Sequence, residues 1–212
     1  HRKVGIPEAL EGSPTVVVDS EDAAGEVPSI YPDDELAGYD ATNRLIQAGC
    51  RRIVYYGTEA DIIAQGLRFE GYKRALAEAG IPFDDALVVN VLEMTNAADE
   101  AARVFDEIKP DGIFCFNDVR ATFIYEAARE CGVRIGIDVS VISIDNQPFI
   151  TDVLKPSLTT LELPHYEMGF EAIRQLVGML DGDEAVADLK SDHGVAVQGH
   201  HDGAEMTLRC RV

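Results

Sequence analysis

Short runs of β-branched and other apolar residues alternate along this chain with longer segments whose apolar residues recur at helical spacing. A strand buried on both faces is apolar throughout, whereas a surface helix is apolar on one side only. This alternation is therefore typical of βαβ units and a mostly parallel sheet. Strands are predicted at residues 14–19, around Ile30, and at 53–56, 87–89, 112–116, 139–144, 158–161 and 206–212, and helices at 33–49, 67–80, 95–108, 118–131 and 165–180.

The first two predicted helices have clear local end signals. Asp33 and Asp34 can cap the first helix, and Gly49 follows its last apolar position. Gly80, with Pro82 just beyond it, ends the second helix. Glycine readily adopts the left-handed conformation that closes a helix, and proline cannot continue one. The pattern thus predicts an α/β fold with helices flanking parallel strands.

The composition is that of a globular chain with a strongly acidic balance. Of its 212 residues, 46% are hydrophobic and 26% are charged, and the formal net charge is -20. A chain of this length can bury a substantial core, so one or two domains are expected. Binding to a phosphate backbone requires clustered Lys and Arg, and the acidity argues against such a surface. We expect a solvated acidic surface that does not hold DNA by itself.

Cysteine usage and hydropathy indicate a cytoplasmic location. Cys50, Cys115, Cys131 and Cys210 stand singly, with no C-x-x-C pair. They are predicted to be reduced thiols, although their even number leaves one disulfide open. The sequence contains neither an apolar run of about 18 residues nor a signal-peptide stretch at its start, so no membrane association is expected. It begins without Met, which suggests that a segment precedes it.

Polar residues follow the predicted strands where they end. Asp19, Asn117, Asp118 and Asp145 each come at the end of an apolar run or just after it. In open α/β sheets the ligand crevice lies at the carboxyl ends of the strands, so these positions are candidates for ligand contact. The alternative for each residue is a local one, because Asn and Asp also favour helix caps and Asx turns. Asp118 has the strongest cap character of the four.

Arg68 lies near the start of the second predicted helix. A guanidinium beside strand-end carboxylates would form a polar cluster that hydroxyl groups of a ligand could bridge. The alternative is an exposed Arg68 paired with Glu70 or another acid, an interaction of little energetic weight.

No catalytic motif is present. The sequence has no G-x-S-x-G, no phosphate-binding G-x-x-x-x-G-K-[ST], no G-x-G-x-x-G and no H-E-x-x-H. His200-His201-Asp202 is a weak candidate for a metal, since adjacent histidines in a polar stretch are more often solvated. Only His165, at a predicted helix start, is placed to meet a ligand. We predict no catalytic residue, no cofactor and no resident metal.

Several segments together resemble the effector domain of the lactose/galactose repressor (LacI/GalR) family. They occur in the family's order and spacing and cover nearly all of residues 14–180. The matching segments are 28–57, Arg68-Phe69-Glu70-Gly71-Tyr72, Ala79-Gly80-Ile81-Pro82, Pro110-Asp111-Gly112 through Asn117-Asp118, 138–145, Leu158-Thr159-Thr160-Leu161 and Glu167-Met168-Gly169.

The resemblance implies two Rossmann-like lobes of the periplasmic-binding-protein-like type I, with ligand in the cleft between them and a homodimer along the lobes. It implies an N-terminal lobe of residues 1–50 and 162–182 and a C-terminal lobe of residues 51–161 and 183–212, with crossovers near Cys50-Arg51, near 161–163 and after Gly182. The positions that correspond to effector contacts are Asp19, Arg68, Asn117, Asp145 and His165.

This sequence departs from the family pattern in three places. Cys50 stands where the family usually has His, and Ile144-Asp145-Asn146 replaces the common Phe-Asp-Asp. The family's DNA-reading helix-turn-helix and the first strands and helices of its N-terminal lobe have no counterpart here. The N-terminal lobe is therefore predicted to be incomplete.

The leading hypothesis is an effector-binding and dimerisation module of a transcriptional regulator, not an enzyme. The effector is expected to be a sugar, with a nucleobase or nucleoside left open, and operator DNA would be contacted only through the helix-turn-helix. The first alternative is a periplasmic sugar-binding protein of an ABC transporter, which shares the lobe architecture. The second is a nucleotide-using α/β enzyme, disfavoured because no phosphate-cradling glycine loop follows a predicted strand.

Overall fold

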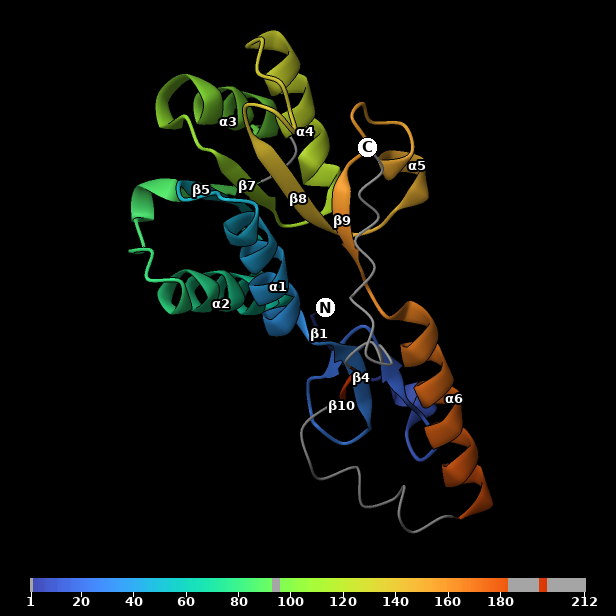
Figure 1. Cartoon of the computed structure of the whole chain (residues 1–212). Helices are drawn as coiled ribbons and strands as arrows, with labels where there is room; N and C mark the ends of the chain where they lie inside the picture. The colour runs from blue at the N-terminus through green and yellow to red at the C-terminus, as the bar shows by residue number, and fades with distance from the viewer. Residues whose placement is uncertain (1, 93–95, 183–194, 198–212) are drawn as a thin grey trace. The chain divides into compact units, whose positions relative to one another are not determined.

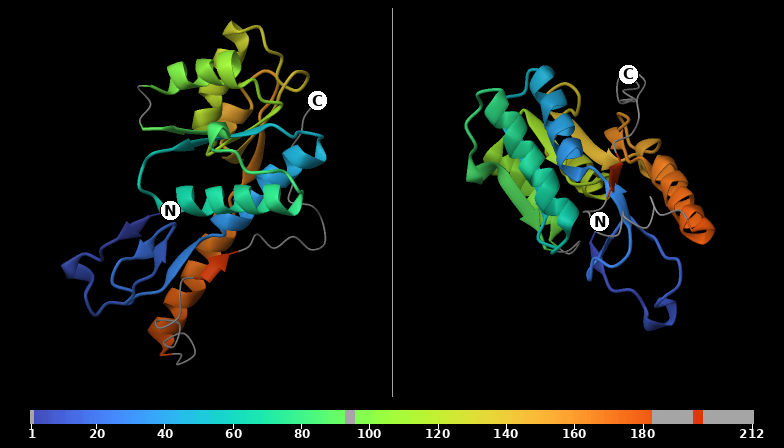
Figure 2. Two further views of the ribbon diagram at one scale, coloured as in Figure 1. Left: turned by 90° about the vertical axis from the view of Figure 1, so that its left-hand side faces the viewer. Right: turned by 90° about the horizontal axis from the view of Figure 1, so that it is seen from below.

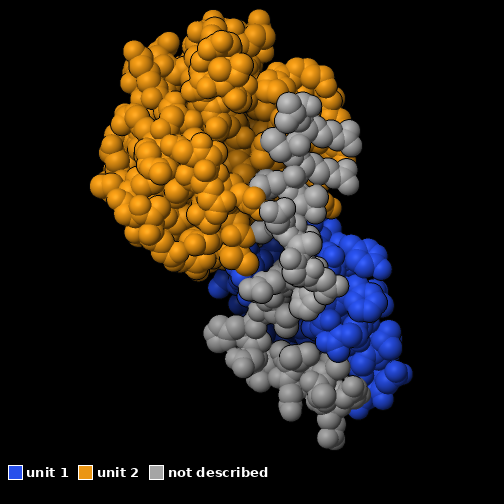
Figure 3. Space-filling view, in the orientation of Figure 1, with its two compact units in different colours: residues 1–33, 62–64, 163–200 blue, residues 34–61, 65–162, 201–212 orange. Residues whose placement is uncertain are grey.

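The computed structural model describes residues 2–92, 96–182 and 195–197 (Figure 1). The chain divides into two units, coloured separately in Figure 3. Unit 1 comprises residues 1–33, 62–64 and 163–200, and unit 2 comprises residues 34–61, 65–162 and 201–212.

Unit 2 is built on a five-stranded parallel sheet in the order β6-β5-β7-β8-β9. The strands are β5 (Ile53–Thr58), β6 (Val88–Val91), β7 (Gly112–Cys115), β8 (Ser140–Asp145) and β9 (Thr159–Glu162). Every residue of β5 and β7 is buried, as expected for central strands of a sheet covered on both faces. Because all five strands run the same way, their carboxyl ends meet at one edge.

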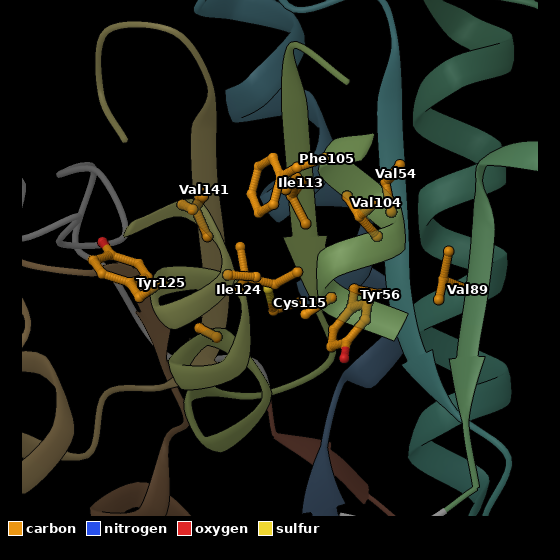
Figure 4. Close-up of a cluster of buried hydrophobic side chains, with 14 of the residues drawn as sticks. Val54, Tyr56, Val89, Val104, Phe105, Ile113, Cys115, Ile124, Tyr125 and Val141 are labelled. Atoms are coloured by element: carbon orange, nitrogen blue, oxygen red, sulfur yellow. The ribbon is translucent and has the colours of Figure 1, made fainter. Parts of the chain in front are cut away.

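Helices cover both faces of this sheet (Figures 1 and 2). The helical elements of unit 2 are α1 (Asp34–Gln47), α2 (Ile63–Glu78, except its first two residues, which fall in unit 1), a 3-10 turn at Asp85–Leu87, α3 (Ala97–Arg103) with a following π-helical turn Val104–Ile108, α4 (Asp118–Glu130) and α5 (Pro148–Thr151). Tyr55 meets Phe69 and Tyr72 of α2, with ring centroids 5.1 Å and 5.4 Å away. Its neighbours Val54 and Tyr56 belong to the cluster formed with α3 and α4 (Figure 4). Successive residues of a strand point to opposite faces of the sheet, so β5 packs against α2 on one face and against α3 and α4 on the other.

Two glycines allow α1 and α2 to cross at close range. A Cβ on Gly38 would overlap the backbone of Arg68, and a Cβ on Gly71 would overlap the backbone of Glu35 and Tyr39. Backbone atoms cannot move aside as a flexible side chain can, so only glycine fits at these two positions. This crossing places Arg68 next to the start of α1.

Unit 1 is smaller. Strands β2 (Val17–Val18), β4 (Ser29–Pro32) and β10 (Val195–Val197) form a parallel sheet in the order β10-β4-β2, and β1 (Lys3–Val4) pairs with β3 (Glu21–Asp22). A 3-10 turn spans Glu8–Leu10, and α6 (His165–Asp181) packs on β4 and β2. The core contains Ile30, Met168 and Ala172.

The predicted α/β fold with parallel sheets flanked by helices is confirmed, with differences in detail. The strand predicted at 14–19 is reduced to β2, and the helix predicted at 95–108 ends its α-helical part at Arg103. The expected first lobe boundary near Cys50 differs from the division at Asp33 and Asp34, because α1 packs on strands β7, β8 and β9. Of residues 183–212, which were expected in the second lobe, the structure describes only β10, and β10 pairs with β4 of unit 1. The strand predicted at 206–212 lies outside the described residues.

Candidate functional site

Three of the five predicted site residues belong to unit 2 and lie at or near the carboxyl edge of its sheet. Asp145 is the last residue of β8, Asn117 follows β7, and Arg68 projects from α2 to the residue after β7. Asp19 and His165 belong to unit 1.

Arg68 is held in one position by several contacts. Its side chain is 4% exposed, and Nε donates to Oδ1 of Asp34 over 2.7 Å. Nη1 donates to the carbonyl oxygen of Phe116 over 2.6 Å, and the guanidinium carbon lies 4.6 Å from the centroid of the Phe116 ring. Arg68 does pair with another acid, Asp34, but the predicted exposed position is wrong because the pair is buried, and Glu70 pairs with Lys73 instead. The buried pair fixes the plane of the guanidinium, which favours directional hydrogen bonding.

Asn117 acts as the N-cap of α4. Its Oδ1 accepts a hydrogen bond from the backbone N–H of Arg120 over 3.0 Å, and its backbone is extended, as an N-cap requires. The local alternative is therefore confirmed for Asn117. It is wrong for Asp118, which is the first residue of the helix rather than its cap.

Asp118 is a buried carboxylate with three hydrogen-bond donors, a role that the sequence did not reveal. Its side chain accepts from the hydroxyls of Ser143 and Thr160, the latter over 2.6 Å, and from the backbone N–H of Gln147 over 2.7 Å. Burial raises the pKa of Asp118, and these hydrogen bonds act in the opposite direction. Asp118 thereby links the start of α4 to β8, to β9 and to the turn after β8.

Asp145 and Asn146 form a turn with unusual backbone angles. Their φ angles are 124° and 55°, in a region that side chains with a Cβ rarely adopt. Oδ2 of Asp145 accepts from Nε2 of Gln147 over 3.0 Å, and Nδ2 of Asn146 donates to Oε2 of Glu162 over 3.1 Å. Asp145 is partly exposed.

The two candidates in unit 1 are exposed. Asp19 has a φ of 55°, and its backbone N–H donates to the carbonyl of Ile30 over 2.8 Å. His165 is the first residue of α6. Unit 1 also contains a cavity of about 670 Å³ lined in part by Asp22, Glu26 and Met179, and none of the five predicted residues lines it.

Among the residues that the structure describes, no group of three or more His, Cys, Asp or Glu side chains could hold a metal ion. No helix there is both long enough and apolar enough to span a bilayer. Cys50, Cys115 and Cys131 are free thiols, and Cys210 and the His200-His201-Asp202 candidate lie outside the described residues.

A parallel α/β unit with polar groups gathered at its strand ends, together with a second parallel α/β unit on the same chain, defines a periplasmic-binding-protein-like effector domain. The comparison with protein families agrees. The chain belongs to this family, since the model of the periplasmic binding protein-like domain matches residues 42–195.

The relatives of this domain are transcription regulators of the LacI family, which confirms the resemblance. The HTH-type transcriptional regulator RegA of Clostridium saccharobutylicum is 34% identical over 173 residues, 80% of this chain and 52% of that protein. The sucrose operon repressor of Escherichia coli is 30% identical over 190 residues, 85% of this chain and 56% of that protein. The solved structure of a LacI family transcriptional regulator from Mycobacterium smegmatis has a TM-score of 0.69 and 29% identity, covering 82% of this chain and 64% of that one. The chain thus spans about half the length of these curated relatives.

Proposed function

We propose that this chain is the effector-binding and dimerisation module of a LacI-type transcriptional regulator, and that its effector is a sugar. The observation that carries the proposal is the fixed, buried Arg68 beside the carboxyl ends of parallel strands, where Asp145 is partly exposed. A sugar hydroxyl both donates and accepts hydrogen bonds, so it can pair with a guanidinium and with a carboxylate.

Each residue has an assigned part in this proposal. Arg68 donates to sugar oxygens, Asp145 accepts from sugar hydroxyls, and Asn117 supplies a further polar contact while it caps α4. Asp19 and His165 are also proposed to contact the effector. One relative is named a sucrose operon repressor, which is consistent with a sugar as the effector. Binding makes or breaks no covalent bond, and it acts by shifting the population of conformations.

We further propose that a helix-turn-helix segment of the regulator binds operator DNA, because the relative RegA is named an HTH-type regulator. The net charge of -20 agrees with a module that senses the effector and leaves the DNA contact to another segment. The transporter alternative is not favoured, because the relatives are named regulators. A regulator of this kind acts in the cytoplasm, which is the location that we propose.

The homodimer has a candidate surface in unit 2. Phe149 in α5 is 73% exposed, and Val153, two residues after the end of α5, is 70% exposed. Large exposed apolar side chains of this kind are typical of an interface. We expect the Phe149→Ser, Val153→Ser double variant to sediment as a monomer at concentrations where the wild type is dimeric, with an unchanged far-UV circular dichroism spectrum. A wild-type chain that sediments as a monomer at all concentrations would remove the homodimer from the proposal.

The effector role is tested by calorimetry of this chain against a panel of mono- and disaccharides that includes sucrose. We expect one sugar to bind, and Asp145→Asn to weaken that sugar about tenfold or more, because a charge-assisted hydrogen bond is lost. Asp152→Asn, an exposed acid after α5, is the matched control and should bind as the wild type does. Equal affinity of Asp145→Asn and wild type would exclude Asp145 as a contact, and a panel without any binder would overturn the sugar assignment.

A further inference from the structure

The turn after β8 holds two consecutive residues, neither of them glycine, in backbone conformations that cost free energy. Asp145 has a φ of 124° and Asn146 has a φ of 55°. Such conformations persist only where surrounding contacts enforce them, and they gather at ligand clamps and catalytic sites. Whatever enforces this turn also sets the direction of the Asp145 carboxylate.

The contacts that enforce the turn converge on one buried side chain. Asp118 is 0% exposed, and its Oδ2 accepts directly from the backbone N–H of Gln147, the residue after the strained pair. The backbone N–H of Asn146 donates to Oγ1 of Thr160 over 3.2 Å, and the same hydroxyl donates to Oδ1 of Asp118 over 2.6 Å. The hydroxyl of Ser143, within β8, donates to that oxygen as well.

We propose that Asp118 is the positioning residue of the effector site. It holds the Asp145–Asn146 turn in a single conformation through Thr160 and Gln147, and so presents the Asp145 carboxylate to the ligand. This inference rests on the proposed effector role of Asp145, and Asp118 itself does not touch the ligand.

A plain helix-stabilising role does not account for this arrangement. An acid in the first turn stabilises a helix from an exposed position, where it interacts with the helix dipole at no desolvation cost. Asp118 is instead fully buried, and the groups that donate to it lie on β8, on β9 and in the turn. A buried carboxylate is tolerated only when it is well hydrogen-bonded, so the role of Asp118 is to hold β8, β9 and the turn together.

Substitutions at Thr160 test the proposal more sharply than substitutions at Asp118, because Val preserves the shape of threonine and Ser preserves its hydroxyl. Thr160→Val keeps the branched shape but removes both the acceptor for Asn146 and a donor to Asp118, whereas Thr160→Ser keeps the hydroxyl. We expect the amide protons of Asn146 and Gln147 to exchange about tenfold faster or more in Thr160→Val than in the wild type, while amides of β5 are unchanged. Thr160→Ser should restore the protection.

Ligand binding supplies the second readout, with the sugar panel as the probe. We expect the sugar that binds the wild type to bind Thr160→Val about tenfold more weakly or worse, and Thr160→Ser within about twofold of the wild type. Unchanged exchange at Asn146 and Gln147 in Thr160→Val would overturn the positioning role. Faster exchange with unchanged affinity would overturn the link to the ligand. A wild type that binds no sugar refutes the proposed effector instead, and the exchange comparison still decides whether Asp118 and Thr160 hold the turn.

Discussion

Replacing Asp34 with Ala removes the carboxylate from the buried pair and leaves the Arg68 guanidinium in place. The two side chains are 0% and 4% exposed, so water screens the remaining charge poorly. Arg68 keeps the 2.6 Å hydrogen bond from Nη1 to the Phe116 carbonyl, but Nε loses its 2.7 Å partner. Removing one partner of a buried pair costs about 3–5 kcal/mol. Because Arg68 keeps its hydrogen bond to Phe116, we expect a loss of about 3 kcal/mol.

The loss is measured by urea unfolding monitored by far-UV circular dichroism and by tyrosine fluorescence, since the chain has 7 tyrosines and no tryptophan. Arg68→Met leaves the carboxylate of Asp34 in the same interior and should also destabilise strongly. The Asp34→Ala, Arg68→Met double variant should cost less free energy than the sum of the two single changes, because neither charge is then left alone.

The matched control is Glu126→Ala, which breaks the exposed pair between Glu126 and Arg129. It should leave the free energy of unfolding without measurable change, because water screens exposed pairs. If Asp34→Ala proved as mild as this control, or if the two single variants of the buried pair were additive, the buried pair would not organise the crossing of α1 and α2.

Two further predictions concern the same unit. Gly71→Ala should destabilise by about 1–3 kcal/mol or more, because its Cβ would overlap the backbone of Glu35 and Tyr39. Gly66→Ala, on the same helix with open space around its Cβ, should stabilise by about 0.5–1 kcal/mol in the same urea assay, and equal effects of the two would contradict the close crossing. The pKa of Asp118 is raised above 3.8 by burial, so its carboxyl favours folding below 3.8 and loses that contribution as pH rises through the raised pKa. The difference in stability between the wild type and Asp118→Asn, measured by thermal unfolding from below pH 3.8 to above the raised pKa, should therefore increase as pH falls. A flat or opposite trend would contradict the burial argument.

Much of the fold followed from local pattern. The apolar run at β5 is buried at every residue, as its composition predicts. Gly49 and Gly80 close their helices with φ angles of 98° and 69°, a conformation that glycine adopts without strain. The rule that strand ends carry ligand sites also singled out Asp145, Asn117 and Asp118 without knowledge of any contact.

The partnerships at the site did not follow from local pattern. Asp34 and Arg68 are 34 positions apart, and they meet because Gly38 and Gly71 let two helices cross closely. The sequence predicted Asp118 to be the better helix cap, but the register of α4 makes Asn117 the cap and directs the Asp118 side chain toward the sheet. The membership of α1 in unit 2 likewise depends on the strands against which it packs.

The sequence by itself therefore determined the strand and helix periods, the α/β class and the edge of the sheet at which we propose the ligand site, because burial pattern and turn chemistry act over a few residues. Only the tertiary structure decided which acid pairs with Arg68 and which carboxylate holds the strained turn at Asp145. Those partners are brought together by packing between elements far apart along the chain, and the local pattern does not encode the register of that packing.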